Sequence, residues 1–224
     1  MSSQPINQKQ KGCHRDRHIL QTIEEWKVLD ADQVRCIFFG HMAYGQRKAQ
    51  ERLLKLHRAE KLQRGRHSDG PYFYYSIDRP GMIKHQIAAN WVRIWLQNTL
   101  SSWEKLHSWN YEQDYKVLRA DAFAAIKNTM SGKFRFMFLE LDRGTNAFNK
   151  VELYNRLYDQ DKYSSWWWVP LADRFPTVLV VTVSESRKRL IQSEIEAKNI
   201  SGLEFKVVLL EDIRKEVMQN AVRL

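Results

Sequence analysis

The fold of this chain is decided by residues 44–75, which read YGQRKAQERLLKLHRAEKLQRGRHSDGPYFYY. Apolar residues recur along one stripe at 44–62, so the first part of the stretch is predicted to be an amphipathic helix. The basic segment 63–71 contains two glycines and a proline, which is typical of a turn-rich loop. An aromatic run at 72–77 has high β propensity, so the loop and its flanks are predicted to form a β-hairpin.

Two shorter helices are predicted before this stretch. Apolar residues recur at helical spacing from Ile19 to Leu29, so a first helix is predicted there with Asp16 as its N-cap. Asp30 begins a second helix, and Gln33 three residues later completes a capping-box pattern. Three helices followed by a basic hairpin describe a winged helix-turn-helix domain, which we place at 16–80. The polar, basic residues 1–15 are predicted to form a flexible arm.

The charge of the chain favours a polyanionic partner. The formal net charge is +10, and residues 1–84 carry sixteen Lys or Arg against nine Asp or Glu. Such an excess favours nucleic acid before an anionic membrane. No stretch approaches the ~20 consecutive apolar residues that cross a bilayer, and the first residues lack the apolar middle of a signal peptide. We therefore expect a cytoplasmic protein that binds double-stranded DNA and has no membrane partner.

The predicted helix at 44–62 and the hairpin after it supply the candidate DNA-binding residues. In a helix-turn-helix, the first residues of the second helix meet base edges in the major groove. Arg and Gln can make bidentate contacts with guanine and adenine, whereas basic residues further along contact phosphates. The alternative interpretation of the helix is a solvated charged face. The candidates are Tyr44, Gln46, Arg47, Lys48, Gln50, Arg52, Lys55, Arg58, Arg64, Arg66 and His67.

The second half of the chain alternates between β and α patterns. A long apolar helix at 81–106 is predicted to link it to the first domain. Strands rich in Val and Leu, separated by amphipathic helices, predict a sheet covered by helices at 107–224. The first two strands are joined too briefly for a helical crossover, so the sheet is predicted to be mixed. The strands are expected at 115–123, 133–142, 177–183 and 205–210, and the helices at 149–163, at 186–198 and at the end of the chain.

Several segments spread along the chain match the pattern of a known family. They are RLLKL at 52–56, the tyrosine-rich run, RADA at 119–122 and FLELDRGT at 138–145, the last followed by Lys150 and by Tyr154 or Tyr158. In these segments the chain resembles the replication-relaxation proteins of bacterial plasmids and conjugative elements, although Ala120 stands where that family usually has Pro. The resemblance implies an accessory or regulatory factor in plasmid or mobile-element replication or conjugative transfer. A relaxase or replication protein would then be a further partner.

The segment at 138–145 also resembles the PD-(D/E)XK fold of restriction endonucleases. In that fold an Asp at one strand end and a Glu-x-Lys on the next strand hold a divalent metal and water. Two such carboxylates can chelate Mg²⁺ against a phosphate, and the Lys supports formation of the hydroxide nucleophile. Here Asp142 occupies the Lys position, so a standard site is complete only if Lys150 reaches in from the next helix. The candidate metal ligands are Asp121, Glu140 and Asp142, and the candidate catalytic residues are these three and Lys150.

Three functions remain as alternatives. They are sequence-specific DNA binding, DNA nicking by a metal-dependent nuclease, and protein interaction through the second domain. DNA binding explains the charge asymmetry, the predicted recognition helix and the hairpin together. For the three carboxylates we favour a structural network compensated by Arg143 or Lys150, without a cofactor, over a Mg²⁺ site. The sequence shows no heptad repeat and leaves open whether the protein forms a homodimer.

Overall fold

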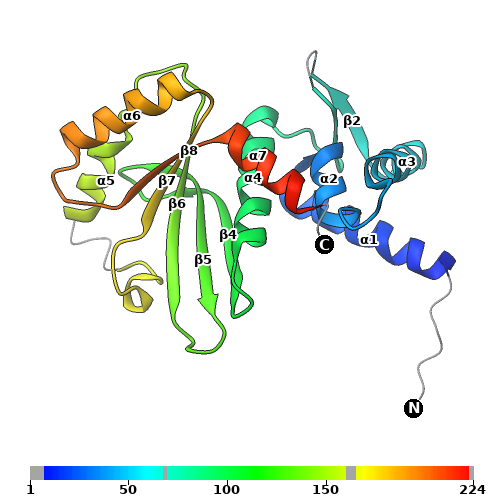
Figure 1. Ribbon diagram of the computed structural model, residues 1–224, viewed down its shortest axis with the longest axis horizontal. Coiled ribbons are helices and arrows are strands. Elements are labelled where there is room, and N and C mark those ends of the chain that lie inside the picture. Colours follow the sequence, from blue (N-terminus) through cyan, green and yellow to red (C-terminus); the bar gives the residue numbers. More distant parts are fainter. Residues whose placement is uncertain (1–7, 68–69, 160–164, 222–224) are drawn as a thin grey trace. The chain divides into compact units, whose positions relative to one another are not determined.

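The computed structural model describes residues 8–67, 70–159 and 165–221. These residues form two compact units, each with its own sheet (Figure 1). Of the described residues, the first unit contains those up to Ile94 and those from Glu216 to Ala221, and the second contains those within Trp95–Lys215. Among the described residues, no helix has both the length and the apolar character that a bilayer crossing requires.

The first unit begins with three helices, as predicted, but the first of them differs from the prediction at both ends. Helix α1 starts at Gln8, so the predicted flexible arm is wrong for residues 8–15; residues 1–7 lie outside the described part. The guanidinium of Arg15 lies over the ring of Phe39, a tertiary contact that orders this helical start. At the other end, Lys27 adopts a φ of 70° and ends the helix. The three helices are α1 (Gln8–Trp26), α2 (Ala31–Phe38) and α3 (Gly45–Arg58).

The predicted capping box at the start of α2 is confirmed. The Asp30 side chain accepts a hydrogen bond from the backbone N–H of Gln33 at 2.7 Å, and the Gln33 side chain accepts one from the N–H of Asp30 at 3.1 Å. Gln33 is fully buried, and its amide also donates to the carbonyl of Ile87 at 2.8 Å. The cap therefore fixes the start of α2 and ties it to the helix that carries Ile87.

A three-stranded antiparallel sheet completes the first unit. Its strands are β1 (Val28–Asp30), β2 (Gln63–Arg66) and β3 (Tyr72–Tyr75), in the order β1-β3-β2. Strands β2 and β3 confirm the predicted hairpin, whereas β1 lies where the sequence predicted the end of the first helix. Because its first two residues, Val28 and Leu29, are both fully buried, β1 lacks the polar alternation that identifies a strand in a sequence.

Helix α4 (Ile83–Thr99) is shorter than the predicted helix at 81–106. The hydroxyl of Thr99 donates to the carbonyl of Leu96 at 3.0 Å in the last turn. Residues from Glu104 onward instead pair with the next strand, because the side chains at 104–108 alternate between shielded and exposed positions. The strand that begins at Glu104 was therefore missed by the prediction.

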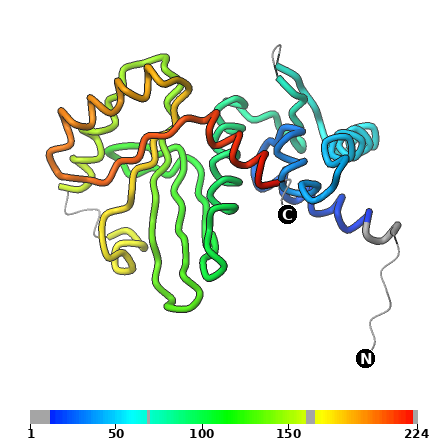
Figure 2. The backbone as a smooth tube through the Cα atoms, viewed as in Figure 1, coloured from blue at the N-terminus to red at the C-terminus, as the bar shows by residue number. Residues whose placement is uncertain are grey.

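The second unit is built on a five-stranded sheet in the order β4-β5-β6-β7-β8. Strands β4, β5 and β6 are antiparallel, whereas β6, β7 and β8 are parallel, so the predicted mixed sheet is confirmed. Figure 2 traces these strands in chain order from green to orange-red. The strands are β4 (Glu104–Asp114), β5 (Arg119–Asn128), β6 (Phe134–Asp142), β7 (Thr177–Thr182) and β8 (Phe205–Leu209). The helices are α5 (Lys150–Asp159), α6 (Glu185–Lys198) and α7 (Leu210–Asn220), with a short 3-10 helix at Val169–Leu171.

Both faces of this sheet are covered. On one face, Phe123 and Phe138 pack in a large core that includes Tyr154 of α5 and Ile191 of α6. On the other face, Ala124 and Ile126 pack against Leu96 near the end of α4. The first face also carries the predicted acidic residues on β5 and β6, because side chains two positions apart on a strand share a face.

Any side chain at Gly65 in β2 is predicted to destabilise the first unit for steric reasons. A Cβ at this position would lie 2.3 Å from Cζ of Phe73, whose ring is buried between the sheet and α4. Replacing Gly65 by Ala is therefore expected to reduce the free energy of unfolding by about 1–3 kcal/mol. Urea unfolding measures this change, and Gly81→Ala is the matched control because a Cβ there meets nothing within 4 Å. Equal unfolding free energies for the two variants would contradict this packing argument.

Candidate nucleic-acid interface and acidic cluster

The buried side of α3 determines which of its residues face solvent. Ala49, Leu53 and Leu56 are buried in the core of the first unit. The opposite side of the helix is exposed and carries five of the predicted DNA-binding residues. These are Arg47, Lys48, Gln50, Lys55 and Arg58.

The first exposed turn of α3 contains a small ion-pair network. Nε of Arg47 lies 2.8 Å from a carboxylate oxygen of Glu51, and Nζ of Lys48 lies 3.2 Å from the other oxygen. Hydrogen bonds from Arg47 and Lys48 hold the pKa of Glu51 below its usual value. The Arg47 side chain is 80% exposed, and exposed pairs of this kind contribute little to stability. Both cations can therefore exchange Glu51 for an external anion at small cost.

Two predicted DNA-binding residues on α3 make contacts within the fold. The amide of Gln46 donates to Asp32 of α2 at 2.7 Å. The guanidinium of Arg52 forms a two-pronged contact with Asp16 of α1, in which Nε donates at 2.9 Å. These side chains brace α3 against the two preceding helices.

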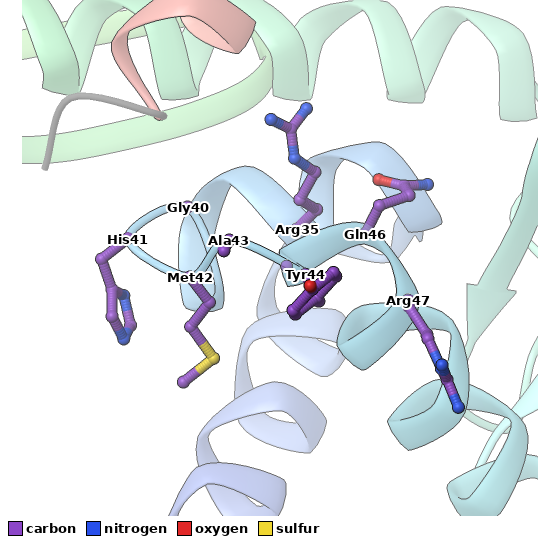
Figure 3. Close-up of a pocket in the computed structure, with 9 residues that line it drawn as sticks. Arg35, Gly40, His41, Met42, Ala43, Tyr44, Gln46 and Arg47 are labelled. Atoms are coloured by element: carbon purple, nitrogen blue, oxygen red, sulfur yellow. The ribbon is translucent and has the colours of Figure 1, made fainter.

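Tyr44 lies at the turn between α2 and α3, beside a hollow of about 360 Å³ (Figure 3). In Figure 3, Arg35 and Gln46 extend to one side of this turn and Arg47 extends to the other. Gly45 makes the turn tight, because a Cβ there would lie 2.3 Å from the carbonyl oxygen of Phe39. The close approach fixes where α3 begins.

The β2–β3 hairpin presents its two arginines on the same face. Arg64 pairs in register with Tyr74, and Arg66 pairs with Tyr72. These four residues line a groove of about 370 Å³ between the hairpin and α3, together with Gln50 and Leu54 of the helix. His67 is half-buried and its ring lies 4.9 Å from that of Phe73, on the core side of the hairpin. Of the three predicted DNA-binding residues of the hairpin, both arginines therefore line the groove, whereas His67 lies on the core side.

In the second unit, Glu140 is buried with two polar partners. Its side chain is 3% exposed, and one oxygen lies 2.9 Å from Nζ of Lys150 on α5. The other oxygen accepts a hydrogen bond from the hydroxyl of Tyr154 at 2.8 Å. Lys150 also donates to the carbonyl of Arg119, and Asp121 accepts from the backbone N–H of Leu141 at 2.6 Å. Lys150 thus reaches the acidic strand from the next helix, which is the arrangement that the sequence analysis named as a condition for a complete site.

Asp142 has a separate partner that the sequence did not reveal. Nε and Nη2 of Arg187 each donate to this carboxylate at 2.7 Å, and the hydroxyl of Thr182 donates at 3.0 Å. Burial acts to raise the pKa of Asp142, but the hydrogen bonds from Arg187 and Thr182 outweigh it and lower the pKa. Arg143, expected as a compensating cation, is exposed. Arg187 lies in the first turn of α6. In the sequence, only the N-cap Ser184 marks this position.

The three acidic residues share one face at one end of the sheet, but they are compensated individually. Glu140 contacts Lys150, Asp142 contacts Arg187, and Asp121 accepts from a backbone amide. Within residues 8–67, 70–159 and 165–221, no group of three or more His, Cys, Asp or Glu side chains is arranged to hold a metal ion. The charge of Asp121 disfavours the charged form of the buried Glu140.

No family model, curated protein or solved structure matches this chain.

Glu140 is expected to make stability fall as pH rises. Burial, assisted by Asp121, raises the pKa of Glu140 to about 7, although Lys150 and Tyr154 oppose the shift. Between an ordinary pKa of 4.5 and this value, the folded protein holds a proton that the unfolded chain has lost. The free energy of unfolding of the wild type relative to Glu140→Gln should therefore fall by up to about 3 kcal/mol across this interval.

Urea unfolding of both proteins from about pH 4.5 to about pH 8 measures this difference. Glu104→Gln is the control, because the hydrogen bond from Arg135 lowers the pKa of Glu104 and moves its titration below this range. A difference between wild type and Glu140→Gln that stays constant with pH would show that Glu140 is already charged in the folded protein at low pH.

Proposed function

We propose that the first unit is a winged helix-turn-helix domain and that the protein binds double-stranded DNA sequence-specifically. The observation that carries the proposal is the common groove of α3 and the β2–β3 hairpin, into which Gln50, Arg64 and Arg66 all face. The order helix, strand, helix, helix, strand, strand also fits such a domain. In it, the second helix of the pair enters the major groove and the hairpin lies beside it.

The exposed first turns of α3 would contact base edges. Arg47 and Gln50 supply the planar donors and acceptors that recognise guanine and adenine, and Lys48 adds a charge beside them. Lys55 and Arg58 lie further along the same exposed side and would contact phosphates. The braces from Gln46 to Asp32 and from Arg52 to Asp16 support base reading, because a helix held rigidly loses less entropy on binding.

The biological setting of this binding is proposed from the resemblance to replication-relaxation proteins. We infer an accessory or regulatory role in the replication or conjugative transfer of a plasmid or mobile element. In that role the second unit would contact a relaxase or replication protein. The mixed sheet and the acidic residues on β5 and β6 support a fold of the PD-(D/E)XK type for that unit, since its order of strands and helices fits.

Metal-dependent nicking of DNA is a second candidate function, favoured by one observation. Lys150 reaches Glu140 from α5 at 2.9 Å and so supplies a cation in place of the one missing at Asp142. Against this, Glu140 is buried and Asp142 is held by Arg187. We therefore propose that the acidic residues stabilise the sheet end and that catalysis is absent.

The assignment of α3 as the base reader can be tested by comparing two arginine substitutions. Arg47→Ala is expected to weaken binding to the best site by about 1–3 kcal/mol and to relax sequence preference. Arg66→Ala is expected to weaken binding to all sequences alike. Selection of bound fragments from random duplex DNA, followed by titration of single sites, measures both effects.

Lys105→Ala, which removes an exposed cation from β4 in the second unit, is the control and should bind as the wild type does. The assignment is wrong if Arg66→Ala changes base preference while Arg47→Ala leaves it unchanged.

The structural role of the acidic cluster can be tested on supercoiled plasmid. With Mg²⁺ or Mn²⁺ present, the purified protein is expected to produce no nicks, and Glu140→Ala is expected to lower its thermal stability. The stability loss follows because Lys150 and Tyr154 would lose a buried partner. Nicking by the wild type that disappears in both Glu140→Ala and Lys150→Ala would instead make the protein a nuclease.

A further inference from the structure

One face of the β2–β3 hairpin combines two arginines with two tyrosines. Side chains alternate along a strand, and the register places Arg64 opposite Tyr74 and Arg66 opposite Tyr72. The other face is apolar, with Phe73 packed against Val28 and Ile83. The two arginines are therefore confined to the face that lines the groove beside α3.

Tyr72 contacts both arginines at once. The guanidinium carbon of Arg64 lies 4.8 Å from the centroid of the Tyr72 ring, and that of Arg66 lies 5.3 Å from the same centroid. Both distances fall within the range in which a guanidinium is attracted by the face of an aromatic ring. Tyr72 is 39% exposed, whereas its neighbours Phe73 and Tyr74 are buried. Part of the Tyr72 ring therefore stays exposed while it contacts the two cations.

The two arginines have no anionic partner within the described part of the chain. Among those residues, neither Arg64 nor Arg66 forms an ion pair with a carboxylate. Arg66 instead donates weakly to the carbonyl of Gly70 at 3.4 Å. Two guanidinium groups held near one ring repel each other, and an anion between them would remove that repulsion. A phosphodiester group fits, because guanidinium binds phosphate oxygens through parallel hydrogen bonds.

We propose that Tyr72 is a positioning residue whose ring holds Arg64 and Arg66 in the groove between α3 and the hairpin. There the two guanidinium groups bind the sugar–phosphate backbone of one DNA strand. Gln50 of α3 faces the same strand from the opposite wall of the groove. The inference rests on the proposed function. It assigns a role in DNA binding to Tyr72, a residue that itself contacts neither a base nor a phosphate. Tyr72 lowers the loss of side-chain entropy on binding, because the two arginines are already ordered in the free protein.

The test uses the full chain and duplex DNA over a range of salt concentrations. Tyr72→Leu removes the ring, and it is expected to weaken binding roughly threefold to tenfold, alike for all sequences. The slope of log K against log salt should become shallower, by up to about 1. Tyr72→Phe and Tyr72→Trp keep an aromatic face and are expected to bind as the wild type does. Thermal unfolding of each variant shows whether the hairpin is intact.

A second comparison separates positioning from direct contact. In a protein that already carries Arg64→Ala and Arg66→Ala, adding Tyr72→Leu is expected to cause no further loss, because the ring has nothing left to hold. A further loss equal to that in the wild-type background would overturn the inference, as would weak binding by Tyr72→Phe. Wild-type protein that fails to bind duplex DNA would overturn the proposed function itself, whereas wild-type binding with an unaffected Tyr72→Leu would overturn only the role of Tyr72.

Discussion

Burial of Ala49, Leu53 and Leu56 fixes the rotation of α3 about its own axis, and the rest of the first unit depends on this constraint. Once these three side chains are inside, Arg47 and Gln50 must face outward. Polar contacts with neighbouring elements support the same orientation, since Asp32 and Asp16 hold Gln46 and Arg52, two half-buried residues of α3. The hairpin follows the same logic, because Phe73 can pack over Gly65 only if the arginines of β2 lie on the opposite face. A basic groove between helix and hairpin is the consequence.

In the second unit, Glu140 and Asp142 each have their own polar partners. Glu140 is placed deep in the sheet with a lysine and a tyrosine, whereas Asp142, two residues later and nearer the strand end, is held by an arginine from α6. The depth of each carboxylate explains the opposite directions of the two pKa values, which rise at Glu140 and fall at Asp142. Such pairs fix how α5 and α6 attach to the sheet. The buried polar residues of this unit therefore hold its helices against its sheet. This supports the view that DNA recognition resides in the first unit.

The features that were predicted correctly from the sequence are those with local signals. The capping box of α2, the apolar stripe of α3 and the turn-rich hairpin each depend on residues a few positions apart, and the short β5–β6 connection was enough to predict a mixed sheet. Features that depend on distant residues were missed. Strand β1 forms because it pairs with β3, and Arg187 meets Asp142 across 45 positions of sequence. The placement of His67 on the core side of the hairpin could have been found, because it directly follows Arg66, the last residue of β2, and the alternation of side chains continued by one residue gives the opposite face.

The central claim is that the groove of α3 and the hairpin binds the backbone and bases of duplex DNA, and its most direct test is the salt dependence of binding by the full chain. If several phosphates are contacted, log K should fall linearly with log salt, with a slope of about −0.9 for each phosphate. A duplex recovered by selection should bind more tightly than random duplex DNA at every salt concentration, because base contacts add to the phosphate contacts. We expect a slope corresponding to several phosphates together with this preference. A slope near zero would contradict it.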